Sequence, residues 1–411
     1  MGRRFKLVTL LGIRPDIIRM HKLIRLLDRH QKRNGYEHLF AHTGQHYDYE
    51  LDEVFYRQLG VRRPDVNLQV GKSLKRRGGP TTYVHQTALL FERLAEFLEE
   101  EKPDAVLYLG DTNTVLSSVI VARQGIPVIH IEGGGRSYDW RMPEEKNRIV
   151  IDHLSDMIYC YLPRYREILL REGVPPYRIK VAGNLIVDAV EAFMGRAERS
   201  PILKRLGLVP RRYLLFTLHR EENTADRAAL TRTVKELIGL TEQLRCPAVF
   251  PLMPRVRRLL EGWRLMPLLN RAEILVTEPL GFFEFLKLEK HAQLIISDSG
   301  TVQEEALILG TPCLVVRRST ERPETIAAGA TILSEGRLRQ EALRAIRTLN
   351  KWDRTILNPF RTSPSERIFT DLVGRIKTGF FKKSRSYAFI KSDRLIREAY
   401  GRTIRRAVGA S

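Results

Sequence analysis

The chain has 411 residues, of which 43% are hydrophobic and 28% are charged, and this balance is typical of a globular protein with two or three domains of about 150 residues each. Its apolar runs are shorter than the roughly 18 residues of a membrane-spanning helix, and its apolar start lacks the small-residue cleavage site of a signal peptide. The formal net charge of +21 means that anionic partners, such as nucleic acid or a membrane surface, have to be considered.

Cysteine usage indicates the redox environment. The three cysteines are Cys160, Cys246 and Cys313, an odd number with no Cys-x-x-Cys pair. This pattern favours reduced thiols that pack in the interior of a cytoplasmic protein.

Strands and helices are predicted to alternate along the first half of the chain. Runs of strand composition occupy residues 6–11, 38–43, 105–109, 127–131, 157–161 and 178–182. Helices are expected between them, with apolar residues at helical spacing from Ile17 to Leu27 and at residues 48–59, 82–101, 114–124 and 164–172. Residues 72–80 (KSLKRRGGP) are expected to form a basic, Gly-rich loop, which either covers a ligand or is a solvated run of charge.

The second half repeats this alternation. A helix at residues 184–193 leads to a hinge, and strands follow at residues 213–217, 248–252, 272–276, 294–297, 312–316 and 331–333. Right-handed crossovers between such strands give a parallel sheet with helices on both faces. The predicted fold class is therefore α/β, with two Rossmann-like, doubly wound domains at residues 1–190 and 191–368, followed by a closing helix and a basic extension at 369–411.

The basic extension differs in composition from the rest of the chain. Residues 375–411 contain eleven Lys or Arg and two acidic residues, with Phe380, Phe381, Tyr387 and Phe389 among the charges. A solvated helix, or a helix packed on the first domain, would explain this composition. The alternatives are contact with an anionic membrane surface or partner, or binding of nucleic acid.

Charged residues follow several of the predicted strands. Asp111 comes just after the strand at 105–109, and Glu132 just after the strand at 127–131. Side chains beyond the carboxyl ends of neighbouring parallel strands face one ligand crevice, so these two carboxylates are expected to lie in one cleft. Glu144 follows Pro143 in the first turn of a helix, where capping alone would explain it. His219 follows the strand at 213–217, where a lone histidine is often structural.

These segments together resemble the UDP-N-acetylglucosamine 2-epimerase family. The likeness covers most of residues 5–370 and is carried by residues 12–16 (GIRPD), 43–46 (TGQH), 110–156, 218–223 (LHREEN), 297–300 (SDSG), 303–305 (QEE) and 320–324 (TERPE). The resemblance implies a glycosyltransferase-B-like arrangement with an interdomain cleft. It also implies an isomerase acting on a nucleotide sugar, located in the cytoplasm, acting as a homodimer and supplying precursors of surface polysaccharides.

The resemblance also assigns the site residues. It implies catalytic roles for Asp111, Glu132, Glu144 and His219, with Asp111 and Glu144 as acid/base partners at the sugar C2. For UDP or substrate binding it implies Arg14, Arg19, Phe285, Ser299, Gly300, Glu305 and Arg322. Ser299 and Gly300 precede a helix whose backbone N–H groups can hold phosphate, and a Phe such as Phe285 is otherwise more often a core residue.

The implied reaction needs no cofactor. A C2 proton without an adjacent carbonyl is too weakly acidic for a side-chain base, but departure of UDP from C1 makes it acidic and yields a glycal. The reaction then needs two things, which are cations that hold the diphosphate and, separately, a base near C2. The sequence contains no metal-ligand cluster, no P-loop and no GxGxxG fingerprint, so neither a metal nor a nicotinamide cofactor is expected.

Two departures from the common bacterial pattern affect the substrate and its regulation. Where those enzymes have Glu-Ala-Gly-Leu-Arg, this chain has three glycines between Glu132 and Arg136, followed by a shorter loop. That loop, at residues 137–142, and residues 44–50 resemble the branch that acts on more highly modified UDP-aminosugars. Met253 stands where many relatives have a histidine of a regulatory sugar-nucleotide site, so activation by UDP-N-acetylglucosamine is not expected.

Several functions remain compatible with the sequence. The main prediction is a non-hydrolysing 2-epimerase that interconverts UDP-GlcNAc and UDP-ManNAc or a modified pair. A hydrolysing relative would release UDP and N-acetylmannosamine with nearly the same residues. A glycosyltransferase would share the architecture without needing the carboxylates, and a basic nucleic-acid-binding protein is the non-enzymatic alternative.

Overall fold

The computed structural model describes residues 3–45, 53–76, 82–224, 226–270 and 273–383. The chain forms two compact units. Unit 1 contains residues 1–135, 140–185 and 362–411, and unit 2 contains residues 136–139 and 186–361. Residues 362–383 therefore return to unit 1.

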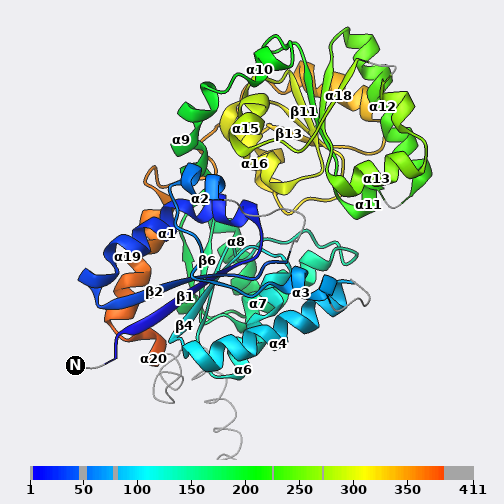
Figure 1. The fold of residues 1–411 in the computed structure, drawn as a ribbon. Helices are drawn as coiled ribbons and strands as arrows, with labels where there is room; N and C mark the ends of the chain where they lie inside the picture. Colours follow the sequence, from blue (N-terminus) through cyan, green and yellow to red (C-terminus); the bar gives the residue numbers. More distant parts are fainter. Residues whose placement is uncertain (1–2, 46–52, 77–81, 225, 271–272, 384–411) are drawn as a thin grey trace, which may run out of the picture. The chain divides into compact units, whose positions relative to one another are not determined.

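Unit 1 is built on a parallel sheet with the order β3-β2-β1-β4-β5-β6-β7 (Figure 1). The strands are β1 (Phe5–Leu11), β2 (Tyr36–His42), β3 (Val66–Asn67), β4 (Ala105–Leu109), β5 (Val128–Ile131), β6 (Met157–Cys160) and β7 (Ile179–Val181). All residues of β4, β5 and β6 are buried, as expected for strands covered on both faces. This explains why β4 and β6 are continuous apolar runs rather than alternating ones, and why β5 is interrupted only by His130.

Helices cover both faces of this sheet. They are α1 (Arg14–Asn34), α2 (Glu53–Leu59), α3 (Val70–Arg76), α4 (Tyr83–Glu101), α5 (Asn113–Leu116), α6 (Ser118–Arg123), α7 (Pro143–Leu154), α8 (Pro163–Arg171), the 3-10 helix η1 (Pro176–Arg178), α19 (Pro364–Lys377) and α20 (Phe380–Lys383). Val8, Leu10, Val106 and Tyr108 form one core cluster with apolar residues of α3 to α7. On the other side, α1 and α19 pack against each other (Figure 1).

Unit 2 repeats this design with the order β10-β9-β8-β11-β12-β13, again all parallel. Its strands are β8 (Leu214–Thr217), β9 (Ala248–Pro251), β10 (Ile274–Thr277), β11 (Leu294–Ser297), β12 (Cys313–Val315) and β13 (Thr331–Leu333). Its helices are α9 (Leu185–Glu198), α10 (Ile202–Arg205), α11 (Glu221–Thr224), α12 (Arg227–Leu244), α13 (Pro254–Gly262), α14 (Met266–Asn270), α15 (Phe282–His291), α16 (Gly300–Leu309), α17 (Pro323–Ala327) and α18 (Leu338–Thr348). The predicted fold class, two doubly wound parallel-sheet domains, is confirmed.

Each sheet has a topological switch point at its centre. In unit 1 the chain leaves β1 for β2 on one side, and β4 lies on the other side of β1. In unit 2 the corresponding neighbours are β8 and β11. Ligands of doubly wound proteins bind beyond the carboxyl ends of such strand pairs. The loops after β1, β4, β8 and β11 are therefore the places to examine for a site.

The structure corrects three local predictions. Residues 72–76, expected in a loop, belong to α3, because Val70 and Leu74 lie one turn apart and are both buried against the unit 1 core. The expected helix at residues 114–124 is divided at Ser117, whose hydroxyl donates to the Thr114 carbonyl oxygen at 2.6 Å. The strand Val66–Asn67 was not predicted, since two residues carry no periodicity.

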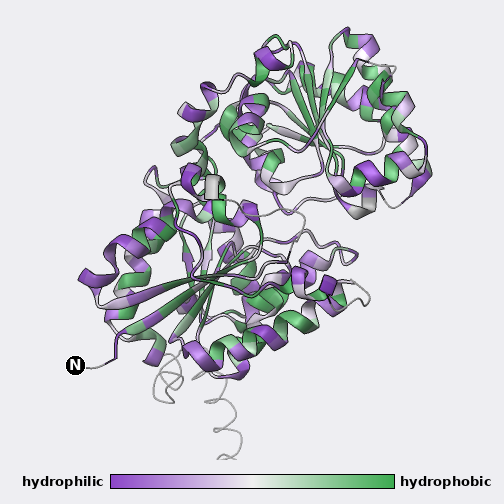
Figure 2. Cartoon of the chain, viewed as in Figure 1, coloured by the Kyte–Doolittle hydropathy of each residue, from purple (hydrophilic) through white to green (hydrophobic). Residues whose placement is uncertain are grey.

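Hydropathy follows the layers of each unit. In Figure 2 the strands are predominantly hydrophobic, and many helices show a hydrophobic face and a hydrophilic face. Among the described residues, no helix combines the length and the apolar character that crossing a bilayer requires. The basic extension is described only as far as α20, so the prediction for residues 384–411 lies outside the described residues.

Candidate active site

The loops after β4 and β5 bring Asp111 and Glu132 into one neighbourhood. The Gly110 amide donates to the Ile131 carbonyl oxygen at 3.1 Å, and a Cβ atom at Gly110 would lie 3.4 Å from Glu132 Oε2. Gly110 has a φ of 77° and Glu132 a φ of 79°, a conformation that is uncommon for residues other than glycine. The backbone thus turns sharply at the end of both strands, and the Glu132 carboxylate lies beside the residue that precedes Asp111.

A buried arginine links Glu132 to a further carboxylate. Arg19 Nη1 donates to Glu132 Oε2, and Arg19 Nη2 donates to Asp16 Oδ1 at 2.9 Å. The Tyr161 hydroxyl also donates to Glu132 Oε2, at 3.3 Å. Burial raises the pKa of Asp16 to about 6, an effect that the adjacent Arg19 only partly offsets and that the charges of Glu132 and Asp111 reinforce. Arg19, predicted to bind substrate, is therefore also the cation that holds Glu132.

Sequence reasoning missed Asp16 as a member of this site. The residue lies in the first turn of α1, directly after β1 and thus at the switch point of unit 1. It is 1% exposed, and its Oδ2 atom has no hydrogen-bond partner among the residues that the structure describes. An acidic residue in the first turn of a helix usually interacts favourably with the helix dipole. This common explanation hid the contact of Asp16 with Arg19.

Asp111 is held by residues of α7. Arg148 donates to Asp111 Oδ2 from Nε at 3.0 Å, and its Nη2 lies 2.8 Å from the same oxygen. Arg148 Nη1 also donates to Glu145 Oε2 at 2.5 Å, and the Asn147 amide donates to the Asp111 carbonyl oxygen at 2.8 Å. Glu145 and Arg148 were not singled out from the sequence, although their spacing of three residues on a helix was a usable signal.

Glu144 and Arg14 lie at helix starts. Glu144 is half-buried in the first turn of α7, next to Glu145, which is 1% exposed. Arg14 is the first residue of α1, and its guanidinium carbon lies 4.4 Å from the centroid of the Phe55 ring. The cation–π contact holds this guanidinium near the carboxyl end of β1. The roles of both residues stay predictions.

In unit 2, Asp298 organises the two loops of the switch point. Its carboxylate accepts the backbone N–H groups of His219 at 3.1 Å and Arg220 at 2.9 Å, and the Asn223 amide at 3.1 Å. His219 Nδ1 lies 3.0 Å from Asp298 Oδ1, while the imidazole is 44% exposed. Burial opposes ionisation of Asp298, but the neighbouring His219 and these hydrogen bonds outweigh it and lower its pKa to about 2. The ionised Asp298 therefore fixes His219.

Ser299 and Gly300 begin α16 directly after this aspartate. The Ser299 hydroxyl caps the helix by accepting from the Val302 N–H at 3.5 Å. Gly300 is needed for close approach, since a Cβ atom there would lie 2.5 Å from Glu321 Oε1. The positive end of a helix that follows β11 at the switch point suits a phosphate group.

The remaining predicted UDP residues lie in the same unit. Glu305 is 5% exposed on α16 and lies near the fully buried Glu289 of α15. Burial raises the pKa of Glu289 well above its usual value, and the charge of Glu305 raises it further. Arg322 is 4% exposed, and its Nε lies 2.5 Å from Glu304 Oε1. Phe285 is half-buried and packs on the core cluster of unit 2, as expected from the commoner role of a Phe on a helix.

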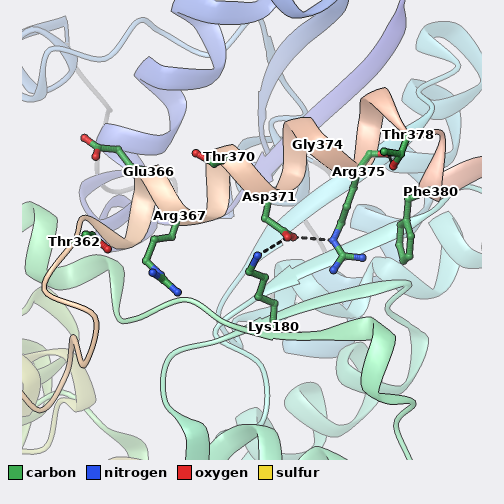
Figure 3. Close-up of a pocket in the computed structure, with 10 residues that line it drawn as sticks. All are labelled: Lys180, Thr362, Glu366, Arg367, Thr370, Asp371, Gly374, Arg375, Thr378 and Phe380. Atoms are coloured by element: carbon green, nitrogen blue, oxygen red, sulfur yellow. Dashed lines mark hydrogen bonds and ion pairs between the residues drawn. The ribbon is translucent and has the colours of Figure 1, made fainter.

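A groove of about 770 Å³ lies elsewhere in unit 1, along α19 (Figure 3). None of the predicted site residues lines it. Asp371 accepts from Lys180 at 2.6 Å, from Arg375 at 2.7 Å and from the Tyr159 hydroxyl at 2.9 Å. These bonds engage Lys180 and Arg375 and attach α19 to β6 and β7. We therefore assign this groove a structural rather than a catalytic role.

Comparisons with known proteins identify the family. A family model described as UDP-N-acetylglucosamine 2-epimerase matches residues 28–370. The chain belongs to this family. Membership confirms the resemblance seen in the sequence and makes the chain an isomerase. Within the described residues, no cluster of His, Cys, Asp or Glu has the geometry of a metal site.

Individual relatives cover nearly the whole chain. A UDP-N-acetylglucosamine 2-epimerase of Methanocaldococcus jannaschii is 38% identical over 369 residues, which are 88% of this chain and 97% of that protein. The crystal structure of the M. jannaschii UDP-GlcNAc 2-epimerase in complex with UDP-GlcNAc and UDP has a TM-score of 0.80 and 35% identity, covering 90% of this chain and 99% of that one. A UDP-2,3-diacetamido-2,3-dideoxy-D-glucuronate 2-epimerase of Pseudomonas aeruginosa is 35% identical over 332 residues, which are 80% of this chain and 88% of that protein.

Proposed function

We propose that the chain interconverts UDP-N-acetylglucosamine and UDP-N-acetylmannosamine without releasing free sugar. The observation that carries the proposal is the group of carboxylates at the unit 1 switch point, in which Asp111, Glu132 and Asp16 interact with two buried arginines, Arg19 and Arg148. A reaction that removes and returns a proton at C2 needs such acids and bases. The archaeal relative bound to UDP-GlcNAc supports the nucleotide sugar as substrate.

The proposed chemistry proceeds by elimination and addition. UDP leaves from C1 while a base removes the C2 proton, which gives free UDP in the site and a glycal. Protonation of C2 on the opposite face and return of UDP to C1 then give the epimer. Asp111 and Glu144 are the proposed acid and base at C2, and Glu132 stabilises the positive charge that develops at C1. A carboxyl group whose pKa is raised to about 6, as that of Asp16 is, suits a site that handles protons.

Unit 2 is proposed to hold the UDP group. The N-terminus of α16, with Ser299 and Gly300, would accept the diphosphate, and His219 would contact it or protonate it. Glu305 would accept both ribose hydroxyls, and Phe285 would lie against the uracil. Arg322 would donate two hydrogen bonds to phosphate, in addition to its bond to Glu304.

A modified UDP-aminosugar is the second candidate substrate. The P. aeruginosa relative, whose name specifies a diacetamido-glucuronate sugar, is 35% identical to this chain. The loop at residues 137–142 also resembles this branch in sequence. Either sugar would undergo the same change at C2, so the catalytic assignment is common to both candidates.

A proton NMR time course in deuterated water tests the proposal. With UDP-GlcNAc, we expect the C2 proton signal to disappear while an anomeric signal of UDP-ManNAc grows. Release of UDP with free N-acetylmannosamine would instead establish a hydrolysing enzyme. An unchanged spectrum with UDP-GlcNAc, together with exchange at C2 of the diacetamido-glucuronate derivative, would establish the second substrate. Loss of the C2 proton from neither sugar would reject the proposal.

A further inference from the structure

His130 and Asp152 form a hydrogen-bonded pair beneath the loops that carry Asp111 and Glu132. His130 is the third residue of β5, and Asp152 lies near the end of α7. His130 Nδ1 lies 2.8 Å from Asp152 Oδ1, and both side chains are 0% exposed. A histidine and a carboxylate that are both fully buried need each other as partners. The chemistry proposed above gives neither residue a role.

The remaining polar atoms of this pair hold both catalytic loops. His130 Nε2 donates to the Gly110 carbonyl oxygen at 2.9 Å, and Gly110 immediately precedes Asp111. The Gly134 backbone N–H donates to Asp152 Oδ2 at 3.0 Å, and Gly134 follows Glu132 by two residues. One buried pair therefore fixes the backbone next to Asp111 and the backbone next to Glu132.

The hydrogen bonds also determine how many protons the pair holds. A carbonyl oxygen only accepts, so His130 Nε2 must carry a hydrogen. The contact between Nδ1 and Oδ1 needs a second hydrogen, whichever of the two atoms carries it. With two hydrogens the pair is electrically neutral as a whole, which avoids the cost of a net charge in a buried place.

The glycines after Glu132 allow this close arrangement. A Cβ atom at Gly133 would lie 2.1 Å from Ile158 Cγ2 and 2.7 Å from Asp152 Oδ1. Gly134 has a φ of 84°, and a Cβ atom there would lie 2.4 Å from the Tyr165 carbonyl oxygen. The Gly133–Gly134 backbone can thus pass directly over Asp152. These close approaches explain why positions 133 and 134 are glycine.

We propose that His130 and Asp152 are positioning residues that set the relative placement of the Asp111 and Glu132 carboxylates. Gly110 and Gly134 belong to different loops, and the pair joins them through four polar atoms on β5 and α7. The consequence for catalysis rests on the function proposed above, whereas the anchoring of the two loops is a separate property that can be measured without substrate.

Two substitutions of Asp152 separate hydrogen bonding from charge. Asp152→Asn keeps the shape, since its Nδ2 can donate to Nδ1 of a neutral His130 and its Oδ1 can accept from Gly134. Asp152→Leu removes both contacts. We expect the Leu variant to lose kcat by about 10²-fold with little change in KM, as is typical of misplaced catalytic groups, and the Asn variant to retain most of its kcat. A folded Leu variant with wild-type kcat, or an Asn variant as slow as the Leu variant, would overturn the proposal.

A matched control lies at the other end of the same strand. Asp156 accepts the Val128 N–H at 3.0 Å, next to the amino end of β5 and away from the catalytic loops. Asp156→Ala should lower stability yet leave kcat unchanged. A similar loss of kcat in this control would show that the effect of Asp152 is general destabilisation, which also overturns the proposal.

Two readouts do not depend on turnover and remain informative if the Leu variant does not fold or the substrate assignment fails. Amide hydrogen exchange of the Gly134 N–H should be slow in the wild type and in Asp152→Asn. In protein with ¹⁵N-labelled histidine, the His130 ring should show a shared Nδ1 hydrogen in addition to the Nε2 hydrogen, and Asp152→Asn should show the Nε2 hydrogen alone. Fast exchange at Gly134 in the wild type, or a His130 ring without the Nε2 hydrogen, would reject the pair.

Discussion

Asp111 shares one guanidinium with Glu145, and this arrangement decides how Asp111 can be tested. Arg148 bonds both carboxylates, and Asn147 bonds the Asp111 backbone. If Asp111 loses its charge, Arg148 retains Glu145 as a buried partner, so the loop should keep its place. Asp111 can therefore be neutralised while the buried Arg148 keeps its ion pair with Glu145.

Asp111→Asn should abolish exchange of the C2 proton and leave UDP affinity within a few fold of the wild type. An amide of the same shape accepts from Arg148 but cannot take up a proton from C2, and all residues proposed to bind UDP except Arg14 and Arg19 lie in unit 2. Exchange is measured by NMR in deuterated water and UDP affinity by calorimetry. Asp104→Asn is the control, because Asp104 precedes β4, where its carboxylate accepts the Lys6 backbone N–H at 2.7 Å and lies 3.7 Å from Arg3 Nη2. Preserved exchange in Asp111→Asn would remove Asp111 from the mechanism.

At the scale of elements, the sequence predicted the strands better than the interactions between them. Buried parallel strands are apolar on both faces, so β4 and β11 could be placed from composition alone. The ion pair between Arg19 and Glu132 joins residues 113 positions apart, and no local pattern reports such a contact. Asp16, Glu145 and Asp152 were missed for another reason. Each lies on a helix, where an acidic residue has a common local explanation.

The switch point of unit 2 depends on Asp298, which bonds the loop after β8 and the start of α11. Its pKa is about 2 in the folded protein and 3.8 in the reference state, so it contributes stability above pH 3.8 that is lost as the pH falls towards 2. The difference corresponds to about 2 kcal/mol at neutral pH. Asp298→Asn should therefore lower the free energy of unfolding by about 2 kcal/mol at pH 7. It should also flatten the acid limb, which is the fall in the free energy of unfolding as the pH decreases.

Urea unfolding at a series of pH values from 2 to 7 checks this expectation. Asp353→Asn is a matched control, since Asp353 also has a lowered pKa, through hydrogen bonds from Thr355, but is exposed. Its acid limb should stay close to that of the wild type because solvent screens an exposed carboxylate. An acid limb in Asp298→Asn equal to that of the wild type would show that Asp298 does not stabilise unit 2 through its charge.

For the whole molecule, the two units have separate cores and separate proposed tasks. A ligand that binds only the folded form of one unit stabilises that unit, by about 2.7 kcal/mol when its concentration is 100 times Kd. We therefore expect UDP to protect amide hydrogens of α16 and of the loops after β8 and β11 from exchange. The amides of α4 and α6 in unit 1 should serve as the unprotected reference.

A substitution of Arg322 can test whether UDP stabilises unit 2 through its proposed phosphate contact. Alanine would be a poor choice, because Glu304 is 0% exposed and pairs with Arg322 at 2.5 Å, and an unpaired buried carboxylate costs about 3–5 kcal/mol. Lysine keeps a positive charge beside Glu304 but lacks the planar group that donates two parallel hydrogen bonds to phosphate. Arg322→Lys should therefore fold normally and bind UDP more weakly by about 1.5–3 kcal/mol.

Calorimetric titration with UDP, combined with thermal unfolding in the presence of UDP, measures both parts of this prediction. Arg257→Lys is the matched control, because Arg257 pairs with Glu278 at 2.6 Å in the same unit and has no proposed contact with UDP. In Arg322→Lys, the UDP-dependent protection of α16 should be lost at a UDP concentration that protects the wild type and the control. Equal affinity in all three proteins would show that UDP binding does not use Arg322, and the phosphate site would then have to be sought in Ser299, Gly300 and His219 alone.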